Sequence, residues 1–112
     1  MKFKKTILID LDGVLNTYTG KYDDGFIPPI KDGAKEFLVE LSRDYKIKLF
    51  TTRDKNLVQD WINENSLSEF VFGVTNMKEL CSVYIDDRCI CFDGDFSTLK
   101  SQISKFKPWY KL

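Results

Sequence analysis

The sequence has 112 residues, 43% of them hydrophobic and 14% aromatic, and its 17 basic residues balance 17 acidic ones. Enough apolar side chains are present for one core, which excludes intrinsic disorder, and no apolar run approaches the roughly 20 residues of a membrane-spanning helix. We expect a single domain over residues 1–112 and no membrane partner. The neutral charge balance argues mildly against a nucleic-acid partner, because such partners usually require a basic surface.

The residue types present restrict the chemistry. The sequence contains no histidine, so a Ser-His-Asp triad, a histidine-ligated zinc site and histidine acid–base catalysis are excluded. Cys81, Cys89 and Cys91 are an odd number of cysteines, and the segment Met1–Lys5 does not begin an export signal. We therefore expect a cytoplasmic protein with reduced thiols, in which Cys89 and Cys91 are small core residues.

Strands and helices alternate in the first half of the chain. A β-branched and apolar run predicts a buried strand over residues 5–10, and a segment rich in Gly, Asp, Tyr and Pro predicts a long loop over 16–31. Asp32 is placed to cap a helix, and a second strand is expected over 47–50. The helix has one apolar stripe, formed by Ala34, Phe37, Leu38 and Leu41.

The same alternation continues to the end of the chain. Asp54 is expected to cap a second helix, whose apolar face carries Leu57, Val58, Trp61 and Ile62. Further strands are expected over 70–74, 82–85 and 89–92, and a last helix is marked by Phe96, Leu99, Ile103 and Phe106. This order is typical of an α/β fold, and we expect one Rossmann-like domain of three layers with a mostly parallel central sheet.

Polar side chains follow three of the expected strands. Because ligands of parallel α/β sheets bind outside the carboxyl ends of the strands, we expect these side chains to share one crevice. Clustered carboxylates repel each other unless protons or a cation lie between them, and oxygen ligands favour a hard ion such as Mg²⁺. Lys78, eight residues before the last acidic pair, is the best candidate for an ammonium group beside a bound phosphate. The residues at the strand ends are Asp10 and Asp12, Thr51 and Thr52, and Asp86 and Asp87.

Two carboxylates after one strand are suited to phosphoryl transfer. A carboxylate at the end of a buried strand can attack phosphorus and form an aspartyl-phosphate. A second carboxylate two residues later can protonate the leaving oxygen and afterwards activate water. A metal ion and a lysine would offset the charge of the phosphoryl oxygens.

Four short motifs occur in a fixed order along residues 5–95. The stretch DLDGVL, which begins at Asp10, is similar to DxDGxL, and Thr51 closes the strand KIKLF. Lys78 lies in TNMKEL, and Asp86 begins an acidic pair after SVYI. Each motif is weak alone, but the ordered set resembles that of the haloacid dehalogenase-like (HAD) phosphohydrolase superfamily.

The resemblance implies a role for each matched residue. Asp10 would be the nucleophile and a Mg²⁺ ligand, and Asp12 would be the general acid/base and would offer its backbone carbonyl to the metal. Thr51 would hold the transferring phosphoryl group with help from the Thr52 amide, and Lys78 would bridge the nucleophile and the phosphate.

The acidic pair would complete the implied metal site. Asp86 would ligate Mg²⁺ directly, and Asp87 would ligate through water or orient Lys78. An aspartate at position 12 resembles the phosphatase branch of the superfamily. Family members usually carry a cap domain, but the possible insertions here, 16–30 and 76–82, have room only for loops. We therefore expect a capless member with an open site, which an oligomeric partner could complete.

Several residues keep two interpretations. Thr51 and Thr52 compete for the phosphate-ligand role, since either can cap the following helix. Arg53 is placed to meet an anionic group of the substrate or to lie in solvent. Asp86 and Asp87 with Arg88 could also be only a solvated strand end with a surface ion pair, and the role of Arg88 stays open. The aromatic pairs Tyr18–Tyr22 and Trp109–Tyr110 are suited either to packing against the domain itself or to contact with a substrate or partner.

The expected function is Mg²⁺-dependent hydrolysis of a phosphomonoester whose identity the sequence does not specify. One alternative is a regulatory module that binds phosphate in a HAD-like pocket with little turnover, because an open site excludes water poorly. The other alternative is a phosphatase of nucleic-acid ends, which an open site would admit.

Overall fold

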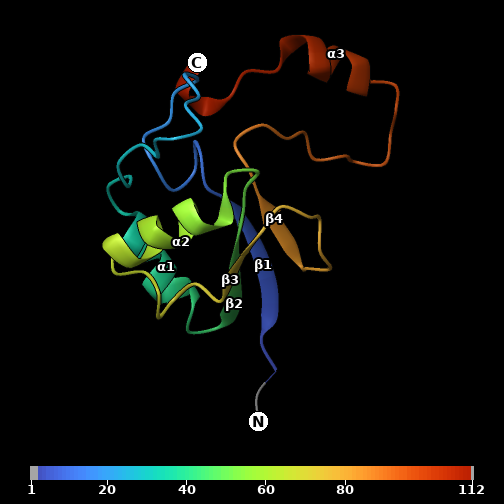
Figure 1. Ribbon diagram of the computed structural model, residues 1–112. Coiled ribbons are helices and arrows are strands. Elements are labelled where there is room, and N and C mark those ends of the chain that lie inside the picture. Colours follow the sequence, from blue (N-terminus) through green and yellow to red (C-terminus); the bar gives the residue numbers. More distant parts are fainter. Residues whose placement is uncertain (1–2, 112) are drawn as a thin grey trace.

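Four parallel strands form the central sheet of the computed structural model, which describes residues 3–111 (Figure 1). β1 lies between β2 and β4, with Ile7 aligned to Ile47 on one side and to Val83 on the other. The expected α/β fold with a parallel sheet is confirmed. The strands are β1 (Lys5–Asp10), β2 (Tyr45–Phe50), β3 (Gly73–Thr75) and β4 (Val83–Ile85), in the spatial order β3-β2-β1-β4.

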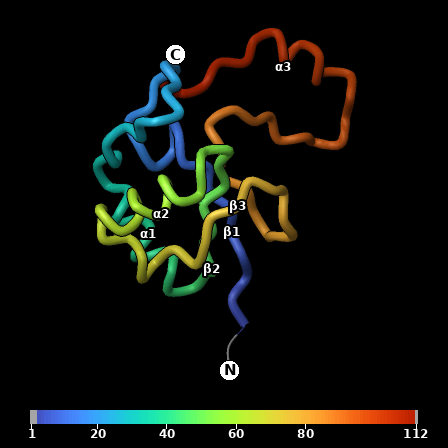
Figure 2. Tube along the Cα trace, viewed as in Figure 1, coloured from blue at the N-terminus to red at the C-terminus, as the bar shows by residue number. Residues whose placement is uncertain are grey.

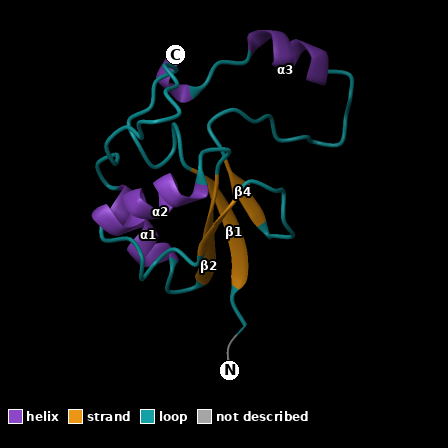
Figure 3. Cartoon of the chain, viewed as in Figure 1, coloured by secondary structure: helices purple, strands orange, loops and turns teal. Residues whose placement is uncertain are grey.

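Two helices cover one face of this sheet. α1 (Ala34–Leu41) connects β1 to β2, and α2 (Lys55–Glu64) connects β2 to β3. Because crossovers of this kind are right-handed and both step in the same direction along the sheet, both helices lie on the same side (Figures 1 and 3). The core fills the space between helices and sheet, and its most buried members include Ile9, Leu38, Leu49, Val58 and Ile62.

The two helices begin differently. The Asp54 carboxylate accepts a hydrogen bond of 3.0 Å from the Leu57 amide and caps α2, as expected. The prediction that Asp32 caps α1 is wrong, because the Ala34 amide closes a turn onto the Lys31 carbonyl and moves the cap position to Gly33. Gly33 has a φ of 87°, and no side chain caps this helix.

Two predicted strands are corrected. The strand expected over 70–74 is shifted to Gly73–Thr75, because the Phe70 and Val71 amides both bond to the Leu67 carbonyl in a helical turn. The strand expected over 89–92 does not form, because the chain turns at Arg88, whose amide bonds to Asp86 Oδ1, and then leaves the sheet (Figure 2). Cys89 and Cys91 are accordingly exposed, not core residues.

The expected third layer is also absent from the described residues. α3 (Leu99–Lys105) buries none of its side chains and does not pack against any described strand or helix. The third layer is missing because no helix connects β3 to β4, so none is placed on the second face of the sheet. After β4 the chain runs through a long irregular segment before it reaches α3 (Figure 3). Within residues 3–111, helices therefore cover only one face of the sheet. None of the described helices is long and apolar enough to cross a membrane.

The different environments of α2 and α3 predict different effects of core truncation. Ile62 of α2 is 1% exposed and Ile103 of α3 is 62% exposed. We expect Ile62→Ala to lower the free energy of unfolding by about 2–5 kcal/mol and Ile103→Ala by less than about 0.5 kcal/mol. Urea denaturation measures both, and a loss above about 1 kcal/mol for Ile103→Ala would mean that α3 packs on the domain in solution.

Candidate functional site

The carboxyl ends of β1 and β4 bring three aspartates together. Ile9 is aligned with Ile85, so Asp10, the last residue of β1, lies beside Asp86 and Asp87. One carboxylate oxygen from each of the three lies within 4.8 Å of the others. A cluster of this kind could hold a metal ion, and the arrangement agrees with the prediction that these strand ends share one crevice.

Asp87 supplies the second observation that points to a cation. Its side chain is fully buried, and its Oδ2 accepts a hydrogen bond of 2.8 Å from the Tyr110 hydroxyl. Among residues 3–111 its Oδ1 has no hydrogen-bond partner, and the guanidinium nitrogen Arg88 Nε is 3.9 Å away. A buried carboxylate oxygen without a partner is unfavourable. A proton on Asp10 or a hard cation between the carboxylates would satisfy it, so the donor set fits an ion such as Mg²⁺.

The crowding of the three carboxylates changes their protonation. Burial, the hydrogen bond that Asp10 makes with Asp87 when it carries a proton, and the neighbouring charges of Asp86, Asp87 and Asp12 raise the pKa of Asp10 to about 8. Burial acts to raise the pKa of Asp87 as well, but hydrogen bonds from Asp10 and Tyr110 outweigh it and hold that pKa below its usual range. Without a cation, the proton of this pair therefore resides on Asp10 at neutral pH.

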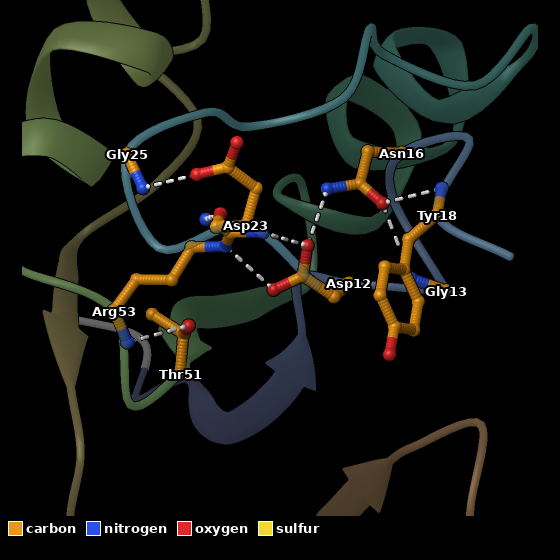
Figure 4. Close-up of polar contacts among 8 residues, drawn as sticks. All are labelled: Asp12, Gly13, Asn16, Tyr18, Asp23, Gly25, Thr51 and Arg53. Carbon is orange, nitrogen blue, oxygen red and sulfur yellow. Dashed lines mark hydrogen bonds and ion pairs between the residues drawn. The ribbon is translucent and has the colours of Figure 1, made fainter. Parts of the chain in front are cut away.

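Asp12 is held apart from the other carboxylates by a buried ion pair (Figure 4). Arg53 donates from Nε to Asp12 Oδ2 over 2.7 Å and from Nη2 to Oδ1 over 3.0 Å. Burial acts to lower the pKa of Arg53, but the bond to Asp12 raises it overall, so the guanidinium stays charged. Its side chain is 1% exposed, which makes Arg53 part of the interior of the site and not a solvated cation.

Arg53 and Asn16 also hold the loop over the strand ends (Figure 4). Asn16 is fully buried, donates to Asp12 Oδ1 over 3.0 Å, and accepts from the Gly13 and Tyr18 amides. Arg53 Nη1 donates to the Asp23 carbonyl over 2.7 Å, and the guanidinium lies 4.6 Å from the centre of the Tyr22 ring. Residues 16–31, predicted as a loop, thus lie over the strand ends and are attached to the site by Asn16 and Arg53. We call this segment the cover.

A pocket of about 160 Å³ lies between this cover and the strand ends. Thr51 is buried, and its Oγ1 accepts a 3.2 Å hydrogen bond from the Arg53 amide, whereas Thr52 is exposed. Lys78 does not line the pocket, since its ammonium lies 5.4 Å from the Tyr84 ring centre. Arg88 is the cation at the pocket edge. The lining residues are Asp10, Asp12, Tyr18, Tyr22, Phe50, Thr51, Thr52, Asp86 and Arg88.

Sequence patterns did not identify two contributors to the site. Asn16 stands directly after the motif DLDGVL, and its polar side chain at the end of an apolar stretch is the one signal that could have been noticed. Tyr110 bonds to Asp87 across 23 residues of sequence, and no local pattern indicates such a contact. Burial and the hydrogen bond to Asp87 raise the pKa of Tyr110 to about 12, so its hydroxyl remains a donor at neutral pH.

Gly13 and Gly33 form a matched pair for testing how tightly the site is packed. Both have a positive φ, 85° and 87°, but a Cβ on Gly13 would clash with Asp87 Oδ2, and one on Gly33 would meet nothing. We expect Gly33→Ala to lower the free energy of unfolding by about 1 kcal/mol through backbone strain alone. Gly13→Ala should lose roughly 1–3 kcal/mol more. Equal losses in urea denaturation would show that Asp87 does not occupy this space.

The raised pKa of Asp10 predicts a specific pH dependence of stability in EDTA. Between the ordinary value of 3.8 and about 8 the folded protein retains a proton that the unfolded chain releases. The free energy of unfolding should therefore fall as the pH rises through this window, and Asp10→Asn should be more stable than wild type at pH values of about 8. Urea denaturation of both proteins across the window measures the difference.

Asp60→Asn is the control for the loss of one carboxylate, because Asp60 is exposed on α2. Parallel pH profiles for wild type and Asp10→Asn would contradict the crowding of charge at Asp10.

Comparison with known proteins identifies the fold and no family. No family model and no curated protein sequence matches the chain. A solved structure described as a conserved protein from Bacteroides thetaiotaomicron is 20% identical, with a TM-score of 0.61, over 91% of each chain. This chain is therefore similar in fold to that bacterial protein, and the similarity concerns the fold alone.

Proposed function

We propose that this chain is a Mg²⁺-dependent phosphomonoester hydrolase of the HAD type, with Asp10 as its nucleophile. One observation carries the proposal: Asp10, Asp86 and a buried, unpaired oxygen of Asp87 converge at the carboxyl ends of parallel strands. The order of the four motifs along the sequence, described above, supports the same assignment independently of the geometry.

Asp10 and Asp12 divide the covalent chemistry between them. A carboxylate oxygen of Asp10 attacks phosphorus, the bond from phosphorus to the substrate oxygen breaks, and the leaving oxygen takes a proton from Asp12. In the second step Asp12 accepts a proton from water as that water attacks the aspartyl-phosphate, which releases phosphate and regenerates Asp10. Both oxygens of Asp12 are engaged by Arg53, so donating a proton requires that at least one of these bonds open.

The acidic cluster would hold the cation through Asp10, Asp86 and Asp87. When bound, Mg²⁺ would offset the charge of the carboxylates and of the phosphoryl oxygens. The positive charge also favours the ionised form of Asp10, whose pKa is otherwise too high for a nucleophile at neutral pH. The cation and the nucleophile therefore depend on each other in this proposal.

The remaining pocket residues would bind the phosphoryl group. Thr51 is the better candidate for its hydroxyl ligand, because Thr51 is buried in the pocket wall and Thr52 is exposed. Arg88 is placed to supply positive charge at the pocket edge. Lys78 would do so only after its ammonium leaves the Tyr84 ring.

The size of the pocket bears on the substrate. A volume of about 160 Å³ is well below the roughly 300–1,000 Å³ of pockets that enclose whole ligands. The pocket suits a phosphoryl group whose parent molecule stays outside, beyond Tyr18 and Tyr22. A pocket that receives only the phosphoryl group admits large phosphorylated substrates as well as small ones.

Phosphate release from a panel of phosphomonoesters tests the proposal. The panel contains sugar phosphates, nucleotides, phosphopeptides and 3′-phosphorylated oligonucleotides, each with Mg²⁺ or with EDTA. We expect release only with Mg²⁺, and Asp10→Asn should lower turnover at least about a thousandfold because the nucleophile is lost.

Asp60→Asn, which leaves the pocket intact, should keep wild-type activity. Undiminished turnover by Asp10→Asn would exclude the covalent mechanism. Binding of Mg²⁺ and inorganic phosphate without turnover of any substrate would instead identify a phosphate-binding module.

A further inference from the structure

The segment after α3 returns to the acidic site. A short 3₁₀ helix, η1 (Trp109–Lys111), lies beside the loop that follows β1 (Figures 1 and 2). Two hydrogen bonds attach it there: the Tyr110 hydroxyl donates to Asp87 Oδ2 over 2.8 Å, and Trp109 Nε1 donates to the Gly13 carbonyl over 2.7 Å. We call Trp109 and Tyr110 the C-terminal clamp.

The Tyr110 bond orients the buried acid of the cluster. Asp87 has two oxygens, and Tyr110 occupies Oδ2, which leaves Oδ1 unpaired in the interior. A carboxylate whose one oxygen is fixed by a donor cannot rotate freely. Tyr110 therefore determines which Asp87 oxygen is available to Asp10 and to a cation.

The Trp109 bond fixes the loop between Asp10 and Asn16. Gly13 accepts from Trp109 through its carbonyl and donates to Asn16 through its amide, so both sides of this residue are held. The clamp is itself braced, because Lys31 Nζ lies 5.2 Å from the centre of the Trp109 ring. The Tyr18 and Tyr110 rings meet edge to face, with 5.9 Å between their centres.

The clamp is not part of the hydrophobic core. Trp109 is 50% exposed, Tyr110 is half-buried, and α3, which precedes them, buries no side chain. Each polar side-chain atom of the clamp is directed at the site and not at the sheet. The contacts of η1 therefore bear on the geometry of the site more than on the stability of the domain.

We propose that Trp109 and Tyr110 are positioning residues of the acidic site. Tyr110 fixes the Asp87 carboxylate, and Trp109 fixes the backbone that carries Asp10 and Asp12. The part of this inference that concerns Mg²⁺ rests on the proposed function, and the part that concerns the backbone does not.

Titration of the protein with Mg²⁺ in the absence of substrate, measured by isothermal calorimetry, tests the role of Tyr110. Removing a group that orients a metal ligand typically weakens metal affinity 10–100-fold, so we expect Tyr110→Phe to raise the Kd for Mg²⁺ at least about tenfold. Tyr45→Phe is the matched control, since Tyr45 lies at the opposite end of β2, and it should bind Mg²⁺ like wild type. Tyr110→Phe also leaves Asp87 Oδ2 without its donor, so the midpoint of urea unfolding should fall as well. The Kd for Mg²⁺ is the deciding measurement, because a purely structural role would lower the midpoint and leave the Kd unchanged.

Hydrogen exchange of backbone amides, read by mass spectrometry over residues 11–16, tests the second part without metal. Trp109→Phe keeps an aromatic ring but loses Nε1, and we expect faster exchange in this segment than in wild type. Wild-type exchange together with wild-type Mg²⁺ affinity in both clamp variants would overturn the inference. If the wild-type protein binds no Mg²⁺, the magnesium assignment fails separately. In that case faster exchange in Trp109→Phe supports the clamp, and unchanged exchange overturns it.

Discussion

Electrostatic repulsion among the aspartates at the strand ends is the constraint on which the rest of the site depends. The parallel register of β1 and β4 places Asp10 beside Asp86 and Asp87, and burial of Asp10 and Asp87 keeps away part of the water that would screen their charges. The surrounding structure compensates residue by residue. Arg53 neutralises Asp12, Tyr110 donates to one oxygen of Asp87, and one oxygen remains for a proton or a cation.

The strands that carry these groups are supported unequally by the rest of the domain. α1 and α2 pack on one face of the sheet and form the core with β1 and β2. Asp10 and Thr51 lie at the ends of these two well-packed strands. β4 is an edge strand with no helix packed on it, and Asp86 and Asp87 follow directly from it. The acidic cluster thus combines the end of a strand that packs on the core with the end of one that does not. Contacts from other segments, such as the bond from Tyr110 to Asp87, hold the second strand end in place.

Sequence patterns predicted the well-supported half of the molecule better than the other half. The strand over 5–10, the capped helix after Asp54 and the meeting of Asp10 with the later acidic pair follow from local periodicity and from the geometry of parallel sheets. The third strand is displaced and the strand over 89–92 is missing because the backbone there forms hydrogen bonds within turns instead of pairing with a neighbouring strand. Short apolar runs do not indicate which of the two will form. Asn16 and Tyr110 act through tertiary contacts that no local pattern encodes.

The bond between Trp109 and Gly13 joins residues 96 positions apart, so the site is completed by a contact of very long sequence separation. The sheet and both core helices lie within residues 5–85, so the elements that build the core do not include η1. With these elements alone the carboxylates are already close, but the Asp87 carboxylate and the Gly13 loop lack their donors from the clamp. Formation of the core and completion of the site therefore depend on different parts of the chain.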